Sequence, residues 1–447
     1  MTSPPAPPGR RTDPGGGAIT VLGRGRHPLP PEDTATLAAA TLVAGARRHL
    51  AAAPLPPAAR RVVLGPLAPA LDAVAAELAR GGRPVVLASG DPGFFGVVRA
   101  LAERFGPERL EVRPDTSSVA EAFARLGLPW DDAVVVSAHG RAPHTAYNVC
   151  RAHRKTAVLT APGAGPAELA AALLRTPGIE RRLIVASDLG GPGEAVEELD
   201  PAEAAARDWP AVNLVLCLAP GGGLGPMRAL AGAPGTPDGW ALPEAAFEHR
   251  DSMVTKAEVR ALALARLGPR TGELVWDVGA GSGSVAVECA RFGAAAVAVE
   301  QDADGVARIR ANARAHGVDV SVVHGRAPGA LAGLPAPDAV FVGGGGGDLP
   351  AVVAACASRA RRTVVVTLAA LDRVPAVREA LTAAGLTCDG VLLQASRLAP
   401  LPGGVSRLAA ANPVFVLWGR RPATDPHPHP RPAAERGHHP APGGTHP

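Results

Sequence analysis

The chain has 447 residues and a formal net charge of +4, so it exceeds one ordinary hydrophobic core and suits two domains of roughly 200 residues each. Aromatic residues make up only 3% of the chain, and Lys155 and Lys256 are its only lysines, so arginine carries nearly all of the positive charge. This composition argues against the basic, aromatic-rich surfaces that bind nucleic acids.

The cysteine pattern and the absence of long apolar runs point to a cytoplasmic protein without a membrane segment. The five cysteines are scattered and stand in apolar surroundings, which favours reduced, buried thiols over disulfides or a metal site. There is no run of about 18 apolar residues. Residues 1–17 lack the apolar core of a signal peptide, so we expect them to form a disordered leader.

Alternating strands and helices predict a first α/β domain over residues 18–218. Short β-branched runs, such as 84–90 and 182–188, are separated by Ala/Leu/Arg-rich stretches, which predicts a mostly parallel sheet. Residues 219–243 are rich in Gly and Pro and show no periodicity, so they are interpreted as a linker.

A second alternation over residues 244–420 predicts a doubly wound, Rossmann-like sheet of seven strands. Its last two strands, 387–396 and 412–419, are separated by too few residues for a crossover helix and should form an antiparallel pair. Residues 421–447 are rich in Pro, His and Gly and are expected to form a disordered tail, with metal capture by its histidines as the alternative.

A glycine-rich turn opens the candidate cofactor site of the second domain. The run Asp277–Gly283 follows a strand and precedes a helix, so its glycines allow close approach of a ligand to unpaired N–H groups. Glu300 ends the next strand, where doubly wound folds place an acid against ribose hydroxyls. The alternative is an ordinary tight turn with a solvated Glu300.

The spacing Asp-x-Gly-x-Gly-x-Gly resembles the motif of class I S-adenosylmethionine-dependent methyltransferases. That resemblance implies that the turn packs against the methionine moiety, Glu300 holds the ribose and a segment after the third strand borders the adenine. The cofactor-binding residues implied in this domain are Asp277, Gly279, Gly281, Gly283, Glu300, Gly325, Arg326 and Ala327.

A polar segment before this motif narrows the resemblance. The run 249–261 reads HRDSMVTKAEVRA, in which Thr255 and Glu258 suggest a capping box at a helix start. Together with WDVGAGSGSVAVE and PDAVFVGGGGG, it resembles the decarboxylating precorrin methyltransferase domain that acts on carbon 15. His249 and Lys256 are the candidate catalytic residues, with a solvated helix entrance as the alternative for both. Arg250, Lys256 and Arg260 are candidate anchors for substrate carboxylates.

This second domain departs from the family pattern at two places. Residues 343–347 are all glycine where the family usually has a serine, and residues 364–370 read VVVTLAA where polar groups are common. Both departures remove polar side chains from strand ends that could take part in catalysis.

Four motifs of the first domain resemble, in order, the tetrapyrrole methylases, and most closely the precorrin methyltransferase acting on carbon 5. They are ITVLGRG (19–25), VVLASGDPGFFG (85–96), PDTSSVAEAFARLGLPWDD (114–132) and SAHGR (137–141). Each alone is as easily a simple turn. The resemblance implies two α/β half-domains and a cofactor held by Gly23, Gly90, Asp91, Pro92, Ser117 and Ser118. Arg24 and Arg26 replace residues usual in the family, through either substrate contact or drift.

Together the two halves resemble the fused, decarboxylating precorrin methyltransferases that modify carbons 5 and 15. The resemblance implies two methyl transfers from S-adenosylmethionine to a tetrapyrrole substrate and the loss of one CO2. We expect no metal site, no nucleic-acid or membrane partner, and a homo-oligomer. A class I RNA methyltransferase and a non-catalytic tetrapyrrole-binding protein with one degenerate site are the alternatives.

Overall fold

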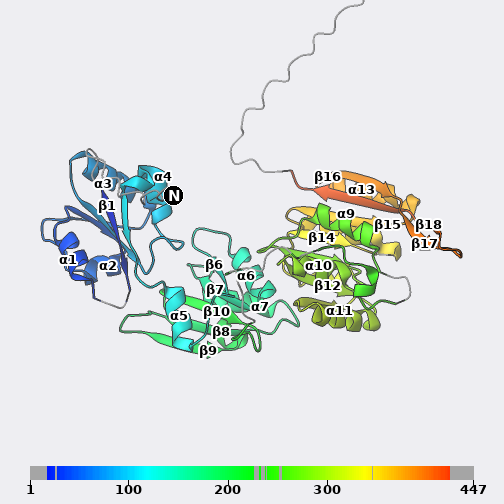
Figure 1. Ribbon diagram of the computed structural model, residues 1–447, viewed down its shortest axis with the longest axis horizontal. Coiled ribbons are helices and arrows are strands. Elements are labelled where there is room, and N and C mark those ends of the chain that lie inside the picture. Colours follow the sequence, from blue (N-terminus) through cyan, green and yellow to red (C-terminus); the bar gives the residue numbers. More distant parts are fainter. Residues whose placement is uncertain are drawn as a thin grey trace, which may run out of the picture.

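The computed structural model describes residues 18–25, 28–225, 231–232, 237, 239–250, 254–344 and 346–422. Figure 1 shows three lobes in sequence order, formed by β1–β5, β6–β10 and β11–β19. The expected leader, part of the expected linker, Arg26 and residues 423–447 of the expected tail lie outside the described residues. Within these residues no helix is both long and apolar enough to cross a bilayer.

The first lobe is a parallel five-stranded sheet in the order β3-β2-β4-β1-β5. Its buried β-branched and leucine side chains pack against helices on the two faces, as expected for strand–helix alternation. The sequence did not predict the short strands β2, β3 and β5. The elements are β1 (Ile19–Arg24), α1 (Pro31–Ala38), β2 (Leu42–Gly45), α2 (Arg47–Ala52), β3 (Arg60–Val63), α3 (Leu67–Ala79), β4 (Pro84–Ser89), α4 (Val98–Phe105) and β5 (Leu110–Arg113).

The second lobe has a mixed sheet in the order β6-β7-β10-β8-β9, where the sequence predicted a mostly parallel one. Only β6 and β7 pair in parallel; β10 runs antiparallel to both of its neighbours. A short loop, residues 188–194, rather than a helical crossover joins β8 to the unpredicted β9, so that pair is also antiparallel. The elements are α5 (Ser118–Leu126), β6 (Val134–Ser137), α6 (Pro143–Ala152), β7 (Lys155–Leu159), α7 (Pro166–Leu174), β8 (Arg182–Ser187), β9 (Ala195–Leu199), α8 (Pro201–Ala205) and β10 (Asn213–Leu218).

The third lobe is the predicted doubly wound sheet, in the order β13-β12-β11-β14-β15-β19-β16. Its first five strands are parallel, and β19 runs antiparallel to β15 and β16, which confirms the terminal antiparallel pair. The elements are α9 (Ala257–Leu267), β11 (Leu274–Val278), α10 (Ser284–Arg291), β12 (Ala295–Glu300), α11 (Ala303–Ala315), β13 (Val320–His324), β14 (Ala339–Val342), α12 (Leu349–Arg359), β15 (Thr363–Leu368), α13 (Val374–Ala383), β16 (Thr387–Leu393) and β19 (Val414–Arg420).

An additional hairpin, β17 (Ser396–Pro400) and β18 (Ser406–Ala410), lies between β16 and β19 where the sequence predicted only a connection. Its residues are mostly exposed, so they lack the apolar alternation that marks a half-buried strand. Arg397 of β17 bonds the carboxylates of Glu244 and Glu258, which ties the hairpin to the start of α9.

That ion-pair cluster changes the expected helix cap. Thr255 was predicted to cap α9 with Glu258 in a capping box, but Lys256 is the N-cap residue and makes no side-chain cap bond. Glu258 turns to Arg397 instead, and the Glu244 carboxylate accepts the first helical N–H, that of Ala257, at 3.1 Å. The predicted capping box is therefore wrong, because a guanidinium competes for its carboxylate.

The second and third lobes contact each other through buried polar groups. The side chain of Asn148 donates to the Gly272 carbonyl at 3.1 Å, and the Arg181 guanidinium bonds the Asp319 carboxylate at 2.9 Å. Residues 272 and 319 each precede a parallel strand, β11 or β13, so this interface lies at the amino-terminal edge of the third-lobe sheet.

The end of the third lobe extends one residue further than expected. Arg421 was assigned to a disordered tail, but its guanidinium donates to the carbonyls of Ala357, Ala360 and Ala384. These carbonyls lie at the ends of α12 and α13, where backbone acceptors lack helical partners.

Candidate functional site

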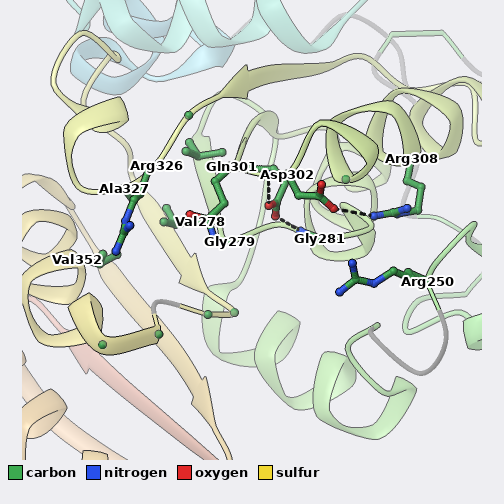
Figure 2. A pocket seen from close by; sticks show the side chains of 18 residues that line it. Arg250, Val278, Gly279, Gly281, Gln301, Asp302, Arg308, Arg326, Ala327 and Val352 are labelled. Carbon is green, nitrogen blue, oxygen red and sulfur yellow. Dashed lines mark hydrogen bonds and ion pairs between the residues drawn. The ribbon is translucent and has the colours of Figure 1, made fainter.

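A cavity of about 490 Å³ lies at the carboxyl ends of β11, β12, β13 and β14. Figure 2 shows Gly279 and Gly281 of the turn after β11 facing it, together with Asp302 after β12 and Arg326 after β13. Carboxyl ends of parallel strands are the edge at which doubly wound folds bind ligands. The interface with the second lobe occupies the opposite edge of the same sheet.

The glycine turn leaves room for a ligand at one position and is closely packed at two others. Gly279, Gly281 and Gly283 all have positive φ, at 71°, 57° and 73°, a region that side-chain-bearing residues rarely adopt. A Cβ on Gly279 would stand 3.2 Å from the Gly344 backbone, and one on Gly283 would stand 2.9 Å from Ile309. A Cβ on Gly281 would meet no protein atom within 4 Å, so this glycine opens onto the cavity.

Glu300 is held in a fixed position by backbone donors. Its two carboxylate oxygens accept the N–H groups of Gly281 at 2.7 Å and of Asp302 at 2.9 Å. Gly305 on α11 packs so closely that a Cβ there would stand 2.7 Å from the Glu300 side chain. Each carboxylate oxygen has a further lone pair, so Glu300 can accept hydroxyl groups from a ligand in the cavity.

Two residues of the predicted motif lie behind the turn and do not line the cavity. Gly283 is the N-cap of α10. Asp277 is 1% exposed, and one of its oxygens accepts the Ala286 N–H at 2.9 Å. Its other oxygen has no hydrogen-bond partner among the described residues. Burial, together with the charge of Glu300, raises the pKa of Asp277 to about 7, although the Ala286 N–H opposes the shift.

The predicted adenine-side segment, Gly325–Ala327, does line the cavity, and Arg326 forms an ion pair with Asp348. The all-glycine departure faces it as well, through Gly343, Gly344, Gly346 and Gly347. Since these positions carry no side chains, the run widens this wall of the cavity and supplies only backbone groups.

Several cavity residues were missed by the sequence reasoning, among them Gln301, Asp302, Gly305 and Arg308. Asp302 and Arg308 form an ion pair at 3.2 Å within the wall. Their place in the sequence could have predicted them, because residues directly after β12 and in the first turns of α11 lie at the carboxyl edge of the sheet.

The predicted catalytic segment is only partly brought to the cavity. Arg250 lines it, whereas His249 and Lys256 do not. The ring Nδ1 of His249 lies 2.8 Å from the Phe247 carbonyl, which favours the tautomer with hydrogen on Nδ1.

Arg260 was a candidate anchor for substrate carboxylates, and the structure contradicts this prediction. Its side chain is 0% exposed, pairs with the equally buried Glu288 at 3.3 Å and lies over the Phe247 ring. Its guanidinium also donates to the carbonyls of Leu242 and Thr255. Arg260 therefore holds the entrance of α9 against α10 and has no surface for a ligand.

In the first domain, three of the four predicted motifs, 19–25, 85–96 and 114–132, meet at one place. The Gly90 N–H donates to the Arg24 carbonyl, and the Asp115 N–H donates to the Gly90 carbonyl. A Cβ on Gly23 would stand 2.2 Å from the Gly90 carbonyl oxygen, so only glycine fits there. Gly90 itself, with φ of 53°, packs against Ser117.

The neighbouring predicted residues shape these loops. The Ser117 hydroxyl accepts the Ala120 N–H as the N-cap of α5, and Ser118 is the first residue of that helix. The Asp91 carboxylate accepts the Gly93 N–H, and Pro92 between them is buried. The segments predicted to hold a cofactor are thus adjacent, and their backbones approach without intervening side chains.

Comparison with protein families matches both parts of the chain. Residues 25–205 match the tetrapyrrole (corrin/porphyrin) methylases, and residues 245–418 match the precorrin methyltransferase domain. The two matches fall on opposite sides of the region interpreted as a linker.

Curated relatives match most of the chain or one of its two parts. A precorrin-6Y C(5,15)-methyltransferase [decarboxylating] from Sinorhizobium sp is 37% identical over 91% of this chain and 94% of its own length. A probable cobalt-precorrin-6B C(15)-methyltransferase (decarboxylating) from Pyrobaculum calidifontis is 37% identical over 39% of this chain and 93% of its own. A cobalt-precorrin-7 C(5)-methyltransferase from Salmonella typhimurium is 32% identical over 45% of this chain and 98% of its own. The chain therefore belongs to the family of decarboxylating precorrin-6Y C(5,15)-methyltransferases.

Proposed function

We propose that this protein transfers two methyl groups from S-adenosylmethionine to a precorrin, at carbons 5 and 15, and removes one carboxyl group as CO2. The observation that carries the proposal is the relationship to a protein of that name over 91% of this chain, supported by the second-domain cavity that the glycine turn and Glu300 line. This combination favours the enzyme over an RNA methyltransferase or a non-catalytic tetrapyrrole-binding protein.

The residues of the second domain fit S-adenosylmethionine. Gly281 leaves the cavity open beside the turn, and Glu300 presents a carboxylate whose position is set by two backbone donors. Gly325 and Ala327 supply a wall with little side chain, suited to a flat base. When bound, the cofactor supplies an electrophilic methyl group on a sulfonium.

The protein's task in methyl transfer is placement. A meso carbon of a reduced tetrapyrrole is already electron-rich, so orientation of the reacting atoms supplies most of what is needed. Gly343, Gly344, Gly346 and Gly347 leave space at the cavity wall for a large planar substrate. Arg250, which reaches the cavity from the segment before α9, is our candidate for binding a substrate carboxylate.

For the decarboxylation, the conjugated macrocycle accepts the electron pair that the departing CO2 leaves behind. The protein must then bind the other carboxylates, keep the reacting acetate unpaired and deliver a proton. Our candidates for proton transfer are His249, which directly precedes Arg250, and Lys256, six residues further on. Neither lines the cavity in the described structure, so this role requires that the segment carry them to the substrate. The Phe247 carbonyl fixes the His249 ring through Nδ1, which directs Nε2 away from that bond.

The test is incubation of the purified chain with precorrin-6B and methyl-labelled S-adenosylmethionine, followed by mass spectrometry of the product. Two labelled methyl groups and the loss of one CO2 are expected. Transfer of label to RNA, or tetrapyrrole binding without any transfer, would contradict the proposal. Glu300→Ala serves as a negative control, because loss of its carboxylate should abolish carbon-15 methylation and CO2 release together.

A further inference from the structure

A positively charged cluster stands at the carboxyl edge of the first-lobe sheet, β3-β2-β4-β1-β5, beside the loops predicted to hold the cofactor. Ser89 ends β4, and its hydroxyl accepts a hydrogen bond from Arg48 at 2.6 Å and lies 3.0 Å from Nε2 of His49. Both partners come from α2, which follows the neighbouring strand β2. Arg24 ends β1 on the other side of β4 and is the direct register partner of Ser89.

The topology explains why these groups meet. The strands run parallel in the order β2-β4-β1, so their carboxyl ends lie at one edge. Register partners in a sheet point to the same face, so the side chains of Arg24 and Ser89 share a face. Gly90 follows Ser89 directly and bonds the Arg24 carbonyl, which places the cluster next to the loop predicted to hold the cofactor.

The positive charge of the cluster is not paired with a described carboxylate; the neighbouring Asp115 carboxylate accepts the backbone N–H groups of Gly25 and Thr116 instead. Among the described residues, neither Arg24 nor Arg48 forms an ion pair with an acid, whereas Arg113, Arg125, Arg181 and Arg397 do. The Nε of Arg24 is buried and has no hydrogen-bond partner in the described part of the chain. Two guanidinium groups that repel each other and leave a buried donor unsatisfied indicate a site completed by an anion.

His49 is suited to neutral hydrogen bonding within this cluster. Burial, then the charge of Arg48 and then that of Arg24, lower the pKa of His49 to about 4. The imidazole is therefore uncharged near neutral pH. It adds a hydrogen-bonding group beside Ser89 without adding a third positive charge.

We propose that Arg24, Arg48 and the Ser89–His49 pair bind a peripheral carboxylate of the tetrapyrrole substrate at the carbon-5 methylation site. This inference rests on the proposed function. Precorrins carry several acetate and propionate groups, and a guanidinium pair matches a carboxylate in both charge and geometry. The methionine carboxylate of the cofactor has the same chemistry, so the experiment must separate the two sources.

The test compares Arg48→Gln with Arg61→Gln, which removes the same charge from exposed β3, where no ion pair is found in the described chain. For each full-length variant, two quantities are measured: the KM of the once-methylated, decarboxylated tetrapyrrole in carbon-5 methylation, and the affinity for S-adenosylmethionine by calorimetry. Loss of one charge-assisted contact should raise this KM about 10- to 100-fold in Arg48→Gln. Cofactor affinity should not change, and Arg61→Gln should match the unsubstituted chain.

Weaker cofactor binding in Arg48→Gln would assign the cluster to the cofactor carboxylate and overturn the proposal. An unchanged KM would overturn it as well. Carbon-15 methylation and CO2 release are measured on the same preparation, so that a failure of the carboxylate site can be told from a failure of the proposed function. If the unsubstituted chain methylates twice and Arg48→Gln behaves identically, the carboxylate site alone fails. If the unsubstituted chain transfers no methyl group, the proposed function fails first.

Discussion

Gly281 is the residue at which the third-lobe cavity depends most directly on the lack of a side chain. Its Cβ would enter the cavity, and its φ of 57° disfavours a branched residue. We expect Gly281→Val to abolish carbon-15 methylation and decarboxylation together. Gly317→Val is the matched control, because Gly317 has φ of 64°, has open space at its Cβ and lies outside the cavity. Unchanged cofactor affinity in Gly281→Val, measured by calorimetry, would remove this turn from the site.

Asp277 makes stability depend on pH. Its raised pKa means that the folded state binds the proton more tightly than the unfolded chain does, so the ionised carboxylate destabilises the fold. Its destabilising effect should grow as pH rises from about 4 to about 7 and then stay constant. Asp277→Asn keeps an acceptor for the Ala286 N–H and removes the charge. The variant should therefore gain stability relative to the parent between pH 5 and pH 7.5 in urea unfolding. An equal difference at both pH values would contradict the assignment.

At the scale of elements, the guanidinium of Arg397 joins the hairpin β17–β18 to the start of α9. Arg397 lies between Glu244 and Glu258 and holds the pKa of Glu244 at about 2 through its hydrogen bond. A lowered carboxyl pKa stabilises the fold above the unfolded pKa, and that stability is lost as pH falls from about 4.5 to about 2. Arg397→Ala should thus cost about 1 kcal/mol at pH 7 and less at pH 3.

The hairpin should also become more sensitive to proteolysis in Arg397→Ala, as followed by mass spectrometry of the fragments. Arg407→Ala is the control, since Arg407 stands on the facing strand β18 and forms no ion pair within the described residues. Equal cleavage in both variants would show that the ion pairs do not hold the hairpin in place.

At the scale of the whole molecule, the interface between the second and third lobes should hold the two fragments together after the chain is cut in the linker. The linker composition predicts two soluble fragments on cleavage within residues 220–242. Separation would expose the Asn148 amide and the Arg181 guanidinium, now 1% and 5% exposed, and each would lose one hydrogen bond across the interface, to Gly272 and Asp319 respectively. Since separation would break these two hydrogen bonds, one of them to a charged partner, we expect the two fragments to fold and stay associated in size-exclusion chromatography.

The double variant Asn148→Ala/Arg181→Ala should release the cut fragments from each other. Arg182→Ala is a suitable control, because Arg182 neighbours Arg181 but pairs with Glu198 inside its own domain. Separation of the cut parent chain without any substitution would show that these contacts contribute little.

The third-lobe cavity and the interface lie at opposite edges of one sheet. We therefore expect the methylations at carbons 5 and 15 to proceed independently. Under the proposed function, Asp91→Ala should give a decarboxylated product methylated once, at carbon 15. Glu300→Ala should leave substrate that keeps its acetate carboxylate, with cofactor affinity lowered at least about tenfold. A mixture of the two variants should restore the twice-methylated product, as followed by mass spectrometry. Loss of decarboxylation in a folded Asp91→Ala chain would contradict this independence.

The sequence by itself determined the doubly wound sheet of residues 274–420 and the positions of Gly281 and Glu300 at its carboxyl edge, and it predicts two domains. These follow from local rules, since hydrophobic alternation sets strands and helices, and strand–turn–helix motifs set the ligand edge. Resemblance to a known family added the prediction of a precorrin methyltransferase, which the relative that matches 91% of this chain supports. The missed strands β2, β3 and β5 have only four residues each, too few to show a period.

Only the tertiary structure decided which charged residues face a ligand and which face the protein. Arg260 and Arg250 stand ten residues apart in one segment, yet the first is buried against Glu288 and the second lines the cavity. Likewise, Glu258 pairs with Arg397, which is 139 residues away, and leaves the helix start uncapped by its own turn. A guanidinium's partner depends on which distant carboxylates and carbonyls the fold brings within a few ångströms, and that proximity has no local signature in the chain.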